Sequence, residues 1–320
     1  MSQSLIFFGS DQYSAVALQT ILQGVLPGVS RKVSVVTDRQ PGGSPVEHLA
    51  RSHNLEFTYY PTTPEEKIVF NGLMVKWSTS PQGGCNGPIP LGLCASFDHL
   101  IPKDVISQFG GRLYNLHPSL LPQYRNVSPV QYAIAMGDKE TGITLFRISP
   151  GIDDGEIIAQ VTEPILATDT TPTLTTRLFQ KGAALFLDAL PDCKVTNLAK
   201  TMGPLIFTHR LNRDSGYIEW SILEQLLANK LVSPGDTKNE LLALRLNKIK
   251  SSGLIIDNWL LVINDLIRSL YPWPGVWSLV PTKKGELRIS LESVTPEVTL
   301  KLAGKPKPIS YADFKKYYLL

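Results

Sequence analysis

Three residues of the sequence have types that suit acyl transfer to an amine: Asn115, His117 and Asp153. An amide side chain can donate a hydrogen bond to a developing oxyanion, and an imidazole, with a reference pKa of about 6.5, can exchange protons near neutral pH. A carboxylate can hold that imidazole in place and relay protons through water. Because no Ser or Cys stands in a nucleophile-elbow setting, the sequence favours direct attack by a substrate amine over an acyl-enzyme.

The spacing of these residues predicts that they meet. Asn115 and His117 lie two positions apart on a predicted strand, RLYNLH (112–117), and therefore share one face. They stand where this strand ends, and an open α/β sheet forms its active-site crevice at that edge. Asp153 follows the next predicted strand in a Gly-bounded loop, so we expect it near the same edge. The alternative is that each polar residue only caps a turn or satisfies a backbone group.

The elements that must position these residues alternate between short apolar runs and helical stretches. Strands are predicted at 5–10, 33–37, 88–97, 112–117, 143–148 and 156–165, and helices at 15–26, 45–53, 102–109, 128–137 and 171–190. Such alternation predicts an α/β fold with a doubly wound, mostly parallel sheet, which binds ligands at the carboxyl ends of its strands.

The composition changes after about residue 195. Residues 1–195 hold 14 Lys and Arg against 17 Asp and Glu, a net charge of −3, whereas residues 196–320 hold 17 against 11, a net charge of +6. Short β-rich runs separated by turn signals predict a smaller β-barrel in this basic part. We expect a catalytic domain at 1–195, a linker at 196–215 and a C-terminal domain at 216–320. The basic part is typical of polyanion binding, although many basic surfaces only face solvent.

Several classes of protein are disfavoured. No apolar run reaches the roughly 18 residues of a membrane-spanning helix. The first predicted strand leads into GSDQYS without a GxGxxG loop, which argues against a dinucleotide-dependent dehydrogenase. The three cysteines, Cys85, Cys94 and Cys193, form no CxxC pair and show no metal-ligand spacing, so we expect ordinary thiols in a reducing compartment. The N-terminal run LIFF offers no cleavable signal.

Two strings in this order closely resemble the motifs of the folate-dependent formyltransferases. NLHPSLLPQYR (115–125) resembles their N-x-H-x-S-L-L-P signature, and GIDDG (151–155) resembles their downstream G-x-D-x-G. INDLIRSLYPWPGVW (263–277) resembles the segment that opens the C-terminal domain of the members acting on methionyl-tRNA. IFFGSDQYSAVALQTIL (6–22) resembles the family's first strand and helix in a fungal form, and PLGLCASFDHLIPKDVI (90–106) resembles the stretch before the catalytic strand. The resemblance covers nearly the whole chain.

The resemblance implies a Rossmann-like formyltransferase sheet followed by an OB-like barrel. It implies transfer of a formyl group from 10-formyltetrahydrofolate to the α-amine of initiator methionyl-tRNA, for translation initiation, without a metal. The family's catalytic trio falls on Asn115, His117 and Asp153, with Asn115 and His117 stabilising the oxyanion and Asp153 assisting proton movement. A monomer without a membrane partner is expected, and the fungal form points to the mitochondrial matrix.

The resemblance also assigns binding residues. Folate is expected against the SLLP turn and a loop lining the pteridine pocket, at Ser119, Leu120, Leu121, Pro122, Phe97, Leu100 and Ile101. The last three residues could instead be plain core. Phosphates of tRNA are expected at Arg39, Arg210, Arg268, Lys283 and Lys284. The two tryptophans of PWPGVW, Trp273 and Trp277, are expected to pack as domain core.

The chain departs from the family pattern at several places. Asn126 stands where the family usually has Gly, and Asn tolerates a left-handed backbone better than most residues. Asp154 stands where the family usually has Thr. The segment 37–50 carries Arg39 as its sole cation, where bacterial enzymes acting on tRNA have a long basic loop. An apparent insertion at about 221–258 is expected to form an amphipathic surface helix, with tRNA contact as the alternative.

Two other functions stay open from the sequence. The chain could be a formyltransferase that acts on a small amine, such as a ribonucleotide or an amino sugar. It could also be a non-catalytic protein that binds folate or RNA on the same scaffold. The basic second domain argues against the first alternative, and the complete Asn–His–Asp set argues against the second.

Overall fold

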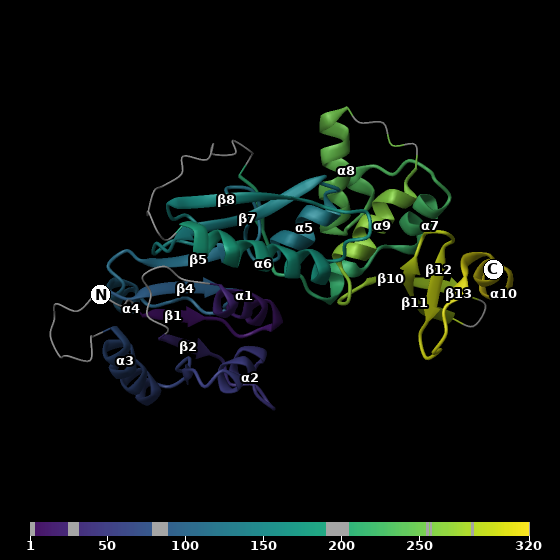
Figure 1. Cartoon of the computed structure of the whole chain (residues 1–320). Helices are drawn as coiled ribbons and strands as arrows, with labels where there is room; N and C mark the ends of the chain where they lie inside the picture. The colour runs from purple at the N-terminus through teal and green to yellow at the C-terminus, as the bar shows by residue number, and fades with distance from the viewer. Residues whose placement is uncertain are drawn as a thin grey trace. The chain divides into compact units, whose positions relative to one another are not determined.

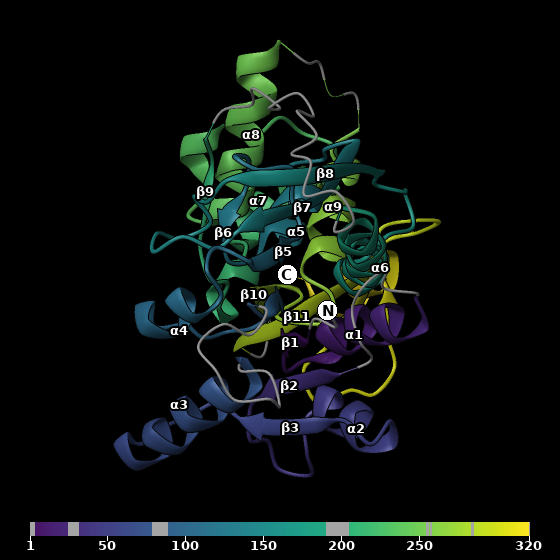
Figure 2. The same cartoon turned by 60° about the vertical axis from the view of Figure 1, so that its left-hand side comes forward.

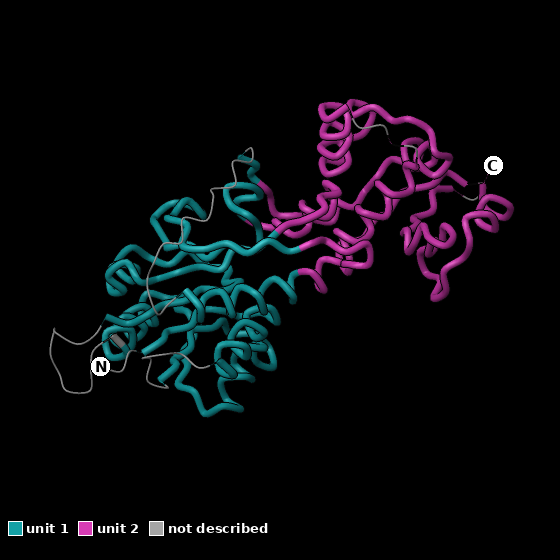
Figure 3. Tube along the Cα trace, turned by 45° about the horizontal axis from the view of Figure 1, so that its top comes forward, with its two compact units in different colours: residues 1–126, 142–163, 175–207 teal, residues 127–141, 164–174, 208–320 magenta. Residues whose placement is uncertain are grey.

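The computed structural model describes residues 4–24, 32–78, 89–189, 205–253, 256, 258–282 and 285–319. The chain divides into two compact units, which Figure 3 shows in different colours. The first unit comprises residues 1–126, 142–163 and 175–207, and the second comprises residues 127–141, 164–174 and 208–320. The domain limits expected from the sequence stay a prediction, and position 195 lies outside the described residues.

A seven-stranded sheet forms the centre of the first unit, in the order β3-β2-β1-β4-β5-β7-β8 (Figure 1). Its strands are β1 (Leu5–Phe8), β2 (Val33–Thr37), β3 (Glu56–Tyr59), β4 (Leu91–Ala95), β5 (Leu113–His117), β7 (Glu140–Arg147) and β8 (Ile157–Pro164). The strands from β3 to β5 pair in parallel, and β7 runs antiparallel to β5. Strands β1, β2 and β4 are buried throughout, as expected for strands covered on both faces.

Helices cover both faces of this sheet. Figure 2 shows α1 (Gln12–Gln23), α2 (Pro45–Ser52) and α6 (Thr171–Ala189) on one face, with α3 (Pro64–Ser78) and α4 (Lys103–Gln108) on the other. Asp11 begins α1 and Ser44 begins α2, and each side chain accepts a hydrogen bond from a backbone N–H of the first turn. The predicted α/β class with a doubly wound, mostly parallel sheet is therefore confirmed.

The second unit contains helices and a separate sheet. Its helices are α5 (Pro129–Ala135), α7 (Trp220–Leu227), α8 (Glu240–Ser252), α9 (Leu260–Ser269) and α10 (Tyr311–Tyr318). Strands β10 (Val276–Thr282), β11 (Gly285–Ser293), β12 (Thr299–Leu302) and β13 (Ile309–Ser310) form an antiparallel sheet in that order. This separate sheet agrees with the predicted barrel-like domain, while its OB type stays a prediction.

Two short strands, β6 (Arg125–Asn126) and β9 (Phe207–Thr208), pair with each other.

The predicted insertion is built into the second unit. Helix α8 is amphipathic as expected, with a buried apolar face of Leu241, Leu242, Leu246 and Ile249. Two of its three cations contact other parts of the unit: Arg245 donates a hydrogen bond to the carbonyl of Met136 at the end of α5, and Lys248 pairs with Asp138. These two cations therefore stabilise the end of α5.

The expectation that both tryptophans of PWPGVW are core is wrong for Trp273. This side chain is 61% exposed, because it stands between two prolines in the turn that joins α9 to β10. Trp277 is half-buried on β10, where Val276, Ser278 and Val280 on the opposite face are buried. Its indole N–H donates a hydrogen bond to the carbonyl of Arg213.

Candidate functional site

His117 is the last residue of β5, and both of its ring nitrogens face acceptors. The residue is only 5% exposed. Its Nε2 lies 2.9 Å from the carbonyl oxygen of Tyr124, and its Nδ1 lies 3.5 Å from Oδ2 of Asp153. Only the contact with Tyr124 has hydrogen-bond geometry, and a carbonyl oxygen can only accept, so Nε2 carries the proton of a neutral ring in this arrangement. The unprotonated Nδ1 of a neutral ring then faces the carboxylate of Asp153.

Asp153 reaches His117 by a route that the sequence does not predict. Because β7 is antiparallel to β5, its last residue, Arg147, is paired with Tyr114 near the start of β5. Strand β7 therefore ends beside the start of β5, and the loop after it must return along the sheet to bring Asp153 next to His117, where it was expected. The loop after β7 folds back tightly at Gly155, where a Cβ atom would lie 1.7 Å from the carbonyl oxygen of Arg147.

Asp153 is fixed by the backbone as well as by His117. Its Oδ2 accepts a hydrogen bond of 3.0 Å from the backbone N–H of Asn126. Asp153 has a φ of 47° and Asn126 a φ of 84°, which confirms the prediction of a left-handed backbone at Asn126. Backbone strain of this kind persists where the surroundings hold it in place, and it is common at functional sites. The neighbouring Asp154 instead accepts a hydrogen bond from Ser149.

Asn115 supplies an amide that the fold does not use. The residue is half-buried on β5, two positions before His117. Within the described part of the chain, its side-chain amide makes no hydrogen bond with another residue. An amide that is partly withdrawn from water and still has its donors available can bind a ligand oxygen. The structure thus brings His117 and Asp153 together, and Asn115 lies two positions before His117 on β5.

The SLLP turn predicted to hold folate lies largely in the interior. Ser119, Leu120 and Leu121 are 0%, 8% and 2% exposed, and Pro122 is half-buried. Ser119 Oγ donates a hydrogen bond of 2.7 Å to the carbonyl of Gln123 within the same loop. The side chains of the first three residues therefore stabilise the loop, and contact with a ligand is left to Pro122 and to backbone groups.

Sequence reasoning missed three residues that shape this site: Tyr124, Thr144 and Gln160. The carbonyl of Tyr124 holds His117, and the side chains of Thr144 on β7 and Gln160 on β8 bond to the loop between His117 and Tyr124. The signal for two of them was readable in the sequence. Each is a polar residue with apolar neighbours on both sides in its strand, and a buried polar group requires a partner.

The loop after β4 gathers aromatic side chains. The Phe97 ring packs against Phe8 at 5.8 Å and Tyr60 at 5.4 Å between centroids, and Tyr60 stacks on His99 at 4.4 Å. Phe97 and Ile101 are partly buried against the core, whereas the Leu100 side chain is 82% exposed. Tyr60 Oη donates to the carbonyl of Leu100 and so fixes this exposed residue. The loop therefore combines core packing with one apolar side chain open to a ligand.

The predicted tRNA-binding cations fall into different surroundings. Arg39 is 62% exposed, pairs with Glu66 at 3.0 Å and lies over the Tyr59 ring. Arg210 is exposed. The Arg268 side chain is only 12% exposed, because its guanidinium bonds to Asp265 at 2.6 Å and to the carbonyl of Asp169 at 2.6 Å. A phosphate could reach Arg268 only by replacing these bonds. Lys283 and Lys284 lie outside the described residues.

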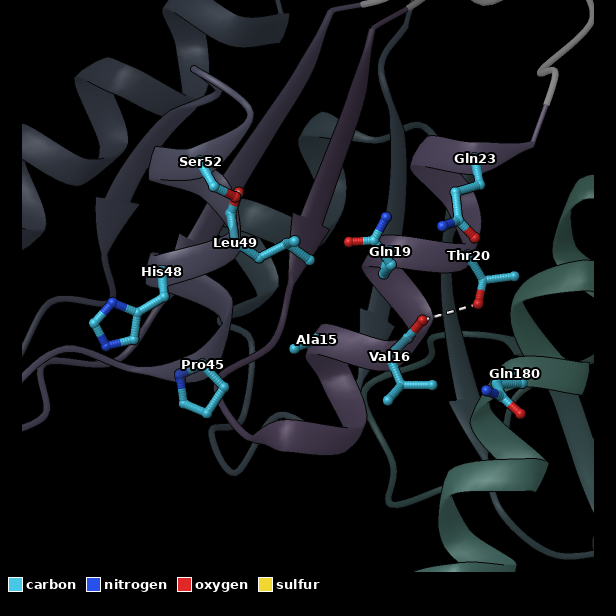
Figure 4. A pocket seen from close by; sticks show the side chains of 10 residues that line it. All are labelled: Ala15, Val16, Gln19, Thr20, Gln23, Pro45, His48, Leu49, Ser52 and Gln180. Carbon is cyan, nitrogen blue, oxygen red and sulfur yellow. Dashed lines mark hydrogen bonds between the residues drawn. The ribbon is translucent and has the colours of Figure 1, made fainter.

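A surface groove of about 720 Å³ lies apart from these residues, between α1 and α2 (Figure 4). Gln19 and Gln23 of α1, His48 and Ser52 of α2, and Gln180 of α6 are among its lining residues. Its lining contains no carboxylate and none of the predicted site residues, so it lacks a contact like that between His117 and Asp153 at the end of β5. Among the described residues, no group of three or more His, Cys, Asp or Glu could hold a metal ion, and no helix is long and apolar enough to cross a membrane.

Comparisons with known proteins agree with this geometry. A family model described as formyl transferase matches residues 90–190, which include Asn115, His117 and Asp153. Methionyl-tRNA formyltransferase of Paraburkholderia phymatum is 30% identical over 233 residues, which cover 69% of this chain and 69% of the relative. Methionyl-tRNA formyltransferase of Streptococcus pyogenes serotype M6 is 28% identical over 327 residues, which cover 97% of this chain and 94% of the relative.

A solved structure extends the likeness to the fold of nearly the whole chain. A sugar 3N-formyl transferase, determined in the presence of dTDP and 5-N-formyl-THF, superposes with a TM-score of 0.53 at 17% identity. The superposition covers 95% of this chain and 99% of that one. Together, the doubly wound sheet and the matched stretch across its central strands define a formyl transferase.

The chain belongs to the methionyl-tRNA formyltransferase family. This assignment rests on the Paraburkholderia phymatum relative, which is 30% identical over more than two thirds of both chains. The family resemblance expected from the two motif strings is thereby confirmed, while the fungal mitochondrial type stays a prediction.

Proposed function

We propose that the protein transfers a formyl group from 10-formyltetrahydrofolate to the α-amine of methionyl-tRNA. Family membership supports the reaction. The observation that supports this location of the site is the contact of 3.5 Å between His117 and Asp153, with the unbonded amide of Asn115 two positions before His117. None of these residues is needed as a nucleophile, since the substrate amine attacks the formyl carbon directly.

The transfer forms one C–N bond and breaks another. The amine nitrogen bonds to the formyl carbon, the carbonyl oxygen becomes an oxyanion, and collapse of the tetrahedral intermediate breaks the bond to N10 of the folate. One proton leaves the attacking amine and one proton ends on N10. Asn115 donates to the oxyanion, which is a role for an amide whose donors are not engaged elsewhere.

His117 and Asp153 manage the proton in this scheme. Because Nε2 of His117 is already bonded to the carbonyl of Tyr124, its Nδ1 side, next to Asp153, is the side available for proton exchange. This arrangement favours proton transfer over a second oxyanion contact for His117, which differs from the role that the sequence motif suggests. The carboxylate of Asp153 stabilises the imidazolium that forms when the amine loses its proton.

The residues near the end of β4 fit the folate. A pterin is flat and aromatic, and binding sites for such rings combine apolar walls with a few polar backbone groups. The exposed Leu100 side chain, held by the bond from Tyr60 to its carbonyl, offers an apolar surface beside the rings of Phe97 and His99. Pro122 and the backbone of the SLLP turn are the remaining candidates for contact.

Two arginines on the second unit fit the phosphates of tRNA. Arg288 lies 4.3 Å and Arg213 lies 5.8 Å from the centre of the Trp277 ring, and Tyr217 packs against the same ring at 4.8 Å. Within the described residues, no carboxylate forms an ion pair with either arginine. Guanidinium groups held on an aromatic surface can bind backbone phosphates.

The deciding assay measures formyl transfer to charged initiator tRNA, to free methionine and to small amines such as a glycinamide ribonucleotide or an amino sugar nucleotide. We expect transfer to the tRNA alone, with a steep loss of kcat/KM as salt rises from about 50 to 200 mM, because phosphate contacts release counterions. Transfer to a small amine without salt dependence would replace the proposed substrate. Formation of no product with any acceptor would favour a non-catalytic folate or RNA-binding protein.

Replacement of both Arg213 and Arg288 by Ala tests the phosphate contacts. We expect KM for tRNA to rise about tenfold and the salt slope to fall by about 2, since each lost phosphate contact lowers the slope by about 1. Lys67→Ala, at an exposed position of α3 in the first unit, is the control and should change neither quantity. A double variant with the wild-type salt slope would place the tRNA elsewhere.

A further inference from the structure

A buried network ties the loop after β5 to the two strands that follow. Thr144 Oγ1 donates a hydrogen bond of 2.6 Å to the carbonyl of Ser119 and accepts one of 3.1 Å from the backbone N–H of Leu121. Gln160 Nε2 donates to the same hydroxyl at 2.8 Å and to the carbonyl of Leu121 at 3.0 Å. A hydroxyl has one donor and two acceptor sites, so all the hydrogen-bonding capacity of Thr144 is used here.

This network fixes the course of the loop. The hydroxyl of Thr144 bonds to the peptide groups on both sides of Leu120 and thereby sets the orientation of each. The Ser119 side chain fixes the next part of the loop by donating a hydrogen bond to the carbonyl of Gln123, the residue before Tyr124. Thr144 and Ser119 are 0% exposed, so water does not replace a lost bond easily.

The loop ends at the group that holds His117. Tyr124 has a φ of 52°, and its carbonyl oxygen lies 2.9 Å from His117 Nε2. That carbonyl determines which ring nitrogen carries the proton of a neutral imidazole, because only a protonated nitrogen can bond to it. Thr144 is also the residue paired with His117 across β5 and β7. Thr144 is thus the strand neighbour of His117, and its side chain also fixes the loop that sets the tautomer of His117.

We propose that Thr144, assisted by Gln160, is a positioning residue that keeps the proton of neutral His117 on Nε2 and its Nδ1 toward Asp153. The link to catalysis rests on the proposed formyl transfer, whereas the effect on the tautomer does not. Thr144 acts only through the loop and touches no substrate. The expected consequence of its loss is a misplaced His117 in a folded protein, with slower transfer at nearly unchanged substrate binding.

The test uses the full chain labelled with ¹⁵N in its histidine rings, with the His117→Asn variant to identify the His117 signals. Spectra recorded at about pH 8.5, where histidine is ordinarily neutral, should show the Nε2–H tautomer for His117 in the wild type. In Thr144→Val, which keeps the shape and removes the hydroxyl, the two ring signals should move toward a mixture of tautomers. Thr144→Ser should restore the wild-type spectrum.

Activity is the second measurement on the same variants. Thr144→Val should lower kcat by about 10- to 100-fold while KM for the formyl donor changes less than about threefold, and Thr144→Ser should recover most of kcat. Gln160→Met leaves the hydroxyl in place and should shift both readouts in the same direction by less. The matched control is Thr141→Val, an equal change at a 3% exposed residue of the same strand, which should leave the His117 spectrum unchanged.

The outcomes separate this proposal from the proposed function. If Thr144→Val does not fold, Gln160→Met and Thr144→Ser still decide it through the His117 spectrum. An Nδ1–H tautomer in the wild type, an unchanged tautomer in Thr144→Val and Gln160→Met, or an equal effect of Thr141→Val overturns the positioning role. If the wild type transfers no formyl group but the tautomer shifts as expected, the proposed function fails and the structural link between Thr144 and His117 stands.

Discussion

The end of β5 in the first unit and the contacts among α5, α8 and α9 in the second unit both concentrate polar and charged side chains, but the fold uses them differently. In the second unit, Asp265 faces Arg268 at 2.6 Å and Arg245 at 3.6 Å, and Lys248 pairs with Asp138. Each of these charges has its partner inside the unit. At the end of β5, Asn115 has no protein partner among the described residues, and His117 approaches Asp153 only at 3.5 Å.

The backbone differs in the same sense. Around His117, Tyr124, Asn126 and Asp153 all have positive φ angles, between 47° and 84°. Helices α8 and α9 instead contribute regular turns and buried apolar faces. Residue type and charge alone therefore do not separate the structural network of the second unit from the candidate site. The candidate site differs in its unused hydrogen-bonding capacity and in the positive φ angles beside the His117–Asp153 contact, features that are common at functional sites.

The largest effect that would test this comparison is expected at Asn115. Asn115→Ala removes an amide that stabilises no described part of the fold, so kcat should fall about 10²- to 10³-fold while the free energy of unfolding changes by less than about 1 kcal/mol. Steady-state formylation of charged tRNA and denaturant unfolding give the two numbers. Asn115→Asp keeps the size and removes the donors, and it should lose at least as much activity. Near-normal transfer by either variant would remove Asn115 from the site.

Asp265 should show the opposite balance. Asp265→Asn leaves the guanidinium groups of Arg245 and Arg268, whose side chains are 11% and 12% exposed, without their counter-charge. Breaking a buried ion pair by neutralising one partner should destabilise the protein by about 3 kcal/mol, measured by denaturant unfolding, with kcat of the folded fraction nearly unchanged. The control is Glu56→Gln, which breaks an exposed pair with Lys32 and should cost less than about 1 kcal/mol. An unchanged stability in Asp265→Asn would mean that the cluster is not a structural one.

The same contrast explains what the sequence could and could not predict. Apolar runs such as LIFF, VSVVT and LGLCA are buried throughout, so the central strands and the class of fold followed from local pattern alone. Strand β3 was not predicted, because EFTY is an edge strand that is largely half-buried and lacks an apolar run. Helix α3 was not predicted either, since Ile68 and Val69 on it are 76% and 65% exposed and blur its apolar face.

The candidate site was predictable only in part. The spacing of Asn115 and His117 predicted that they share one face of a strand. Their proximity to Asp153, however, depends on a loop that folds back from an antiparallel strand. Arg268 was predicted to bind tRNA, and the carbonyls that occupy it come from Leu166 and Asp169, about a hundred positions earlier in the chain. Contacts at such separations depend on the folded topology and leave no local pattern in the sequence.

The smallest expected effect is on stability, at Glu163, a buried carboxylate of the first unit whose partners stabilise the fold. Burial alone would raise the pKa of Glu163, but hydrogen bonds from Lys181 and Arg177 outweigh it and hold the pKa below its ordinary value of 4.5. A carboxylate with a lowered pKa in the folded state stabilises the protein above pH 4.5, and this stabilisation disappears as the pH falls toward the folded-state pKa.

Glu163→Gln removes that contribution. The variant should lose about 1 to 2 kcal/mol of unfolding free energy at neutral pH, and its difference from the wild type should shrink as the pH falls below about 4.5. Urea unfolding from pH 7 down to pH 3.5 measures this difference, with Glu65→Gln at an exposed position of α3 as the control. A constant difference across that range would mean that Glu163 contributes through packing instead of charge. In that case, the pairing of Glu163 with two permanent cations would not set it apart from Asp153, which lies beside a histidine.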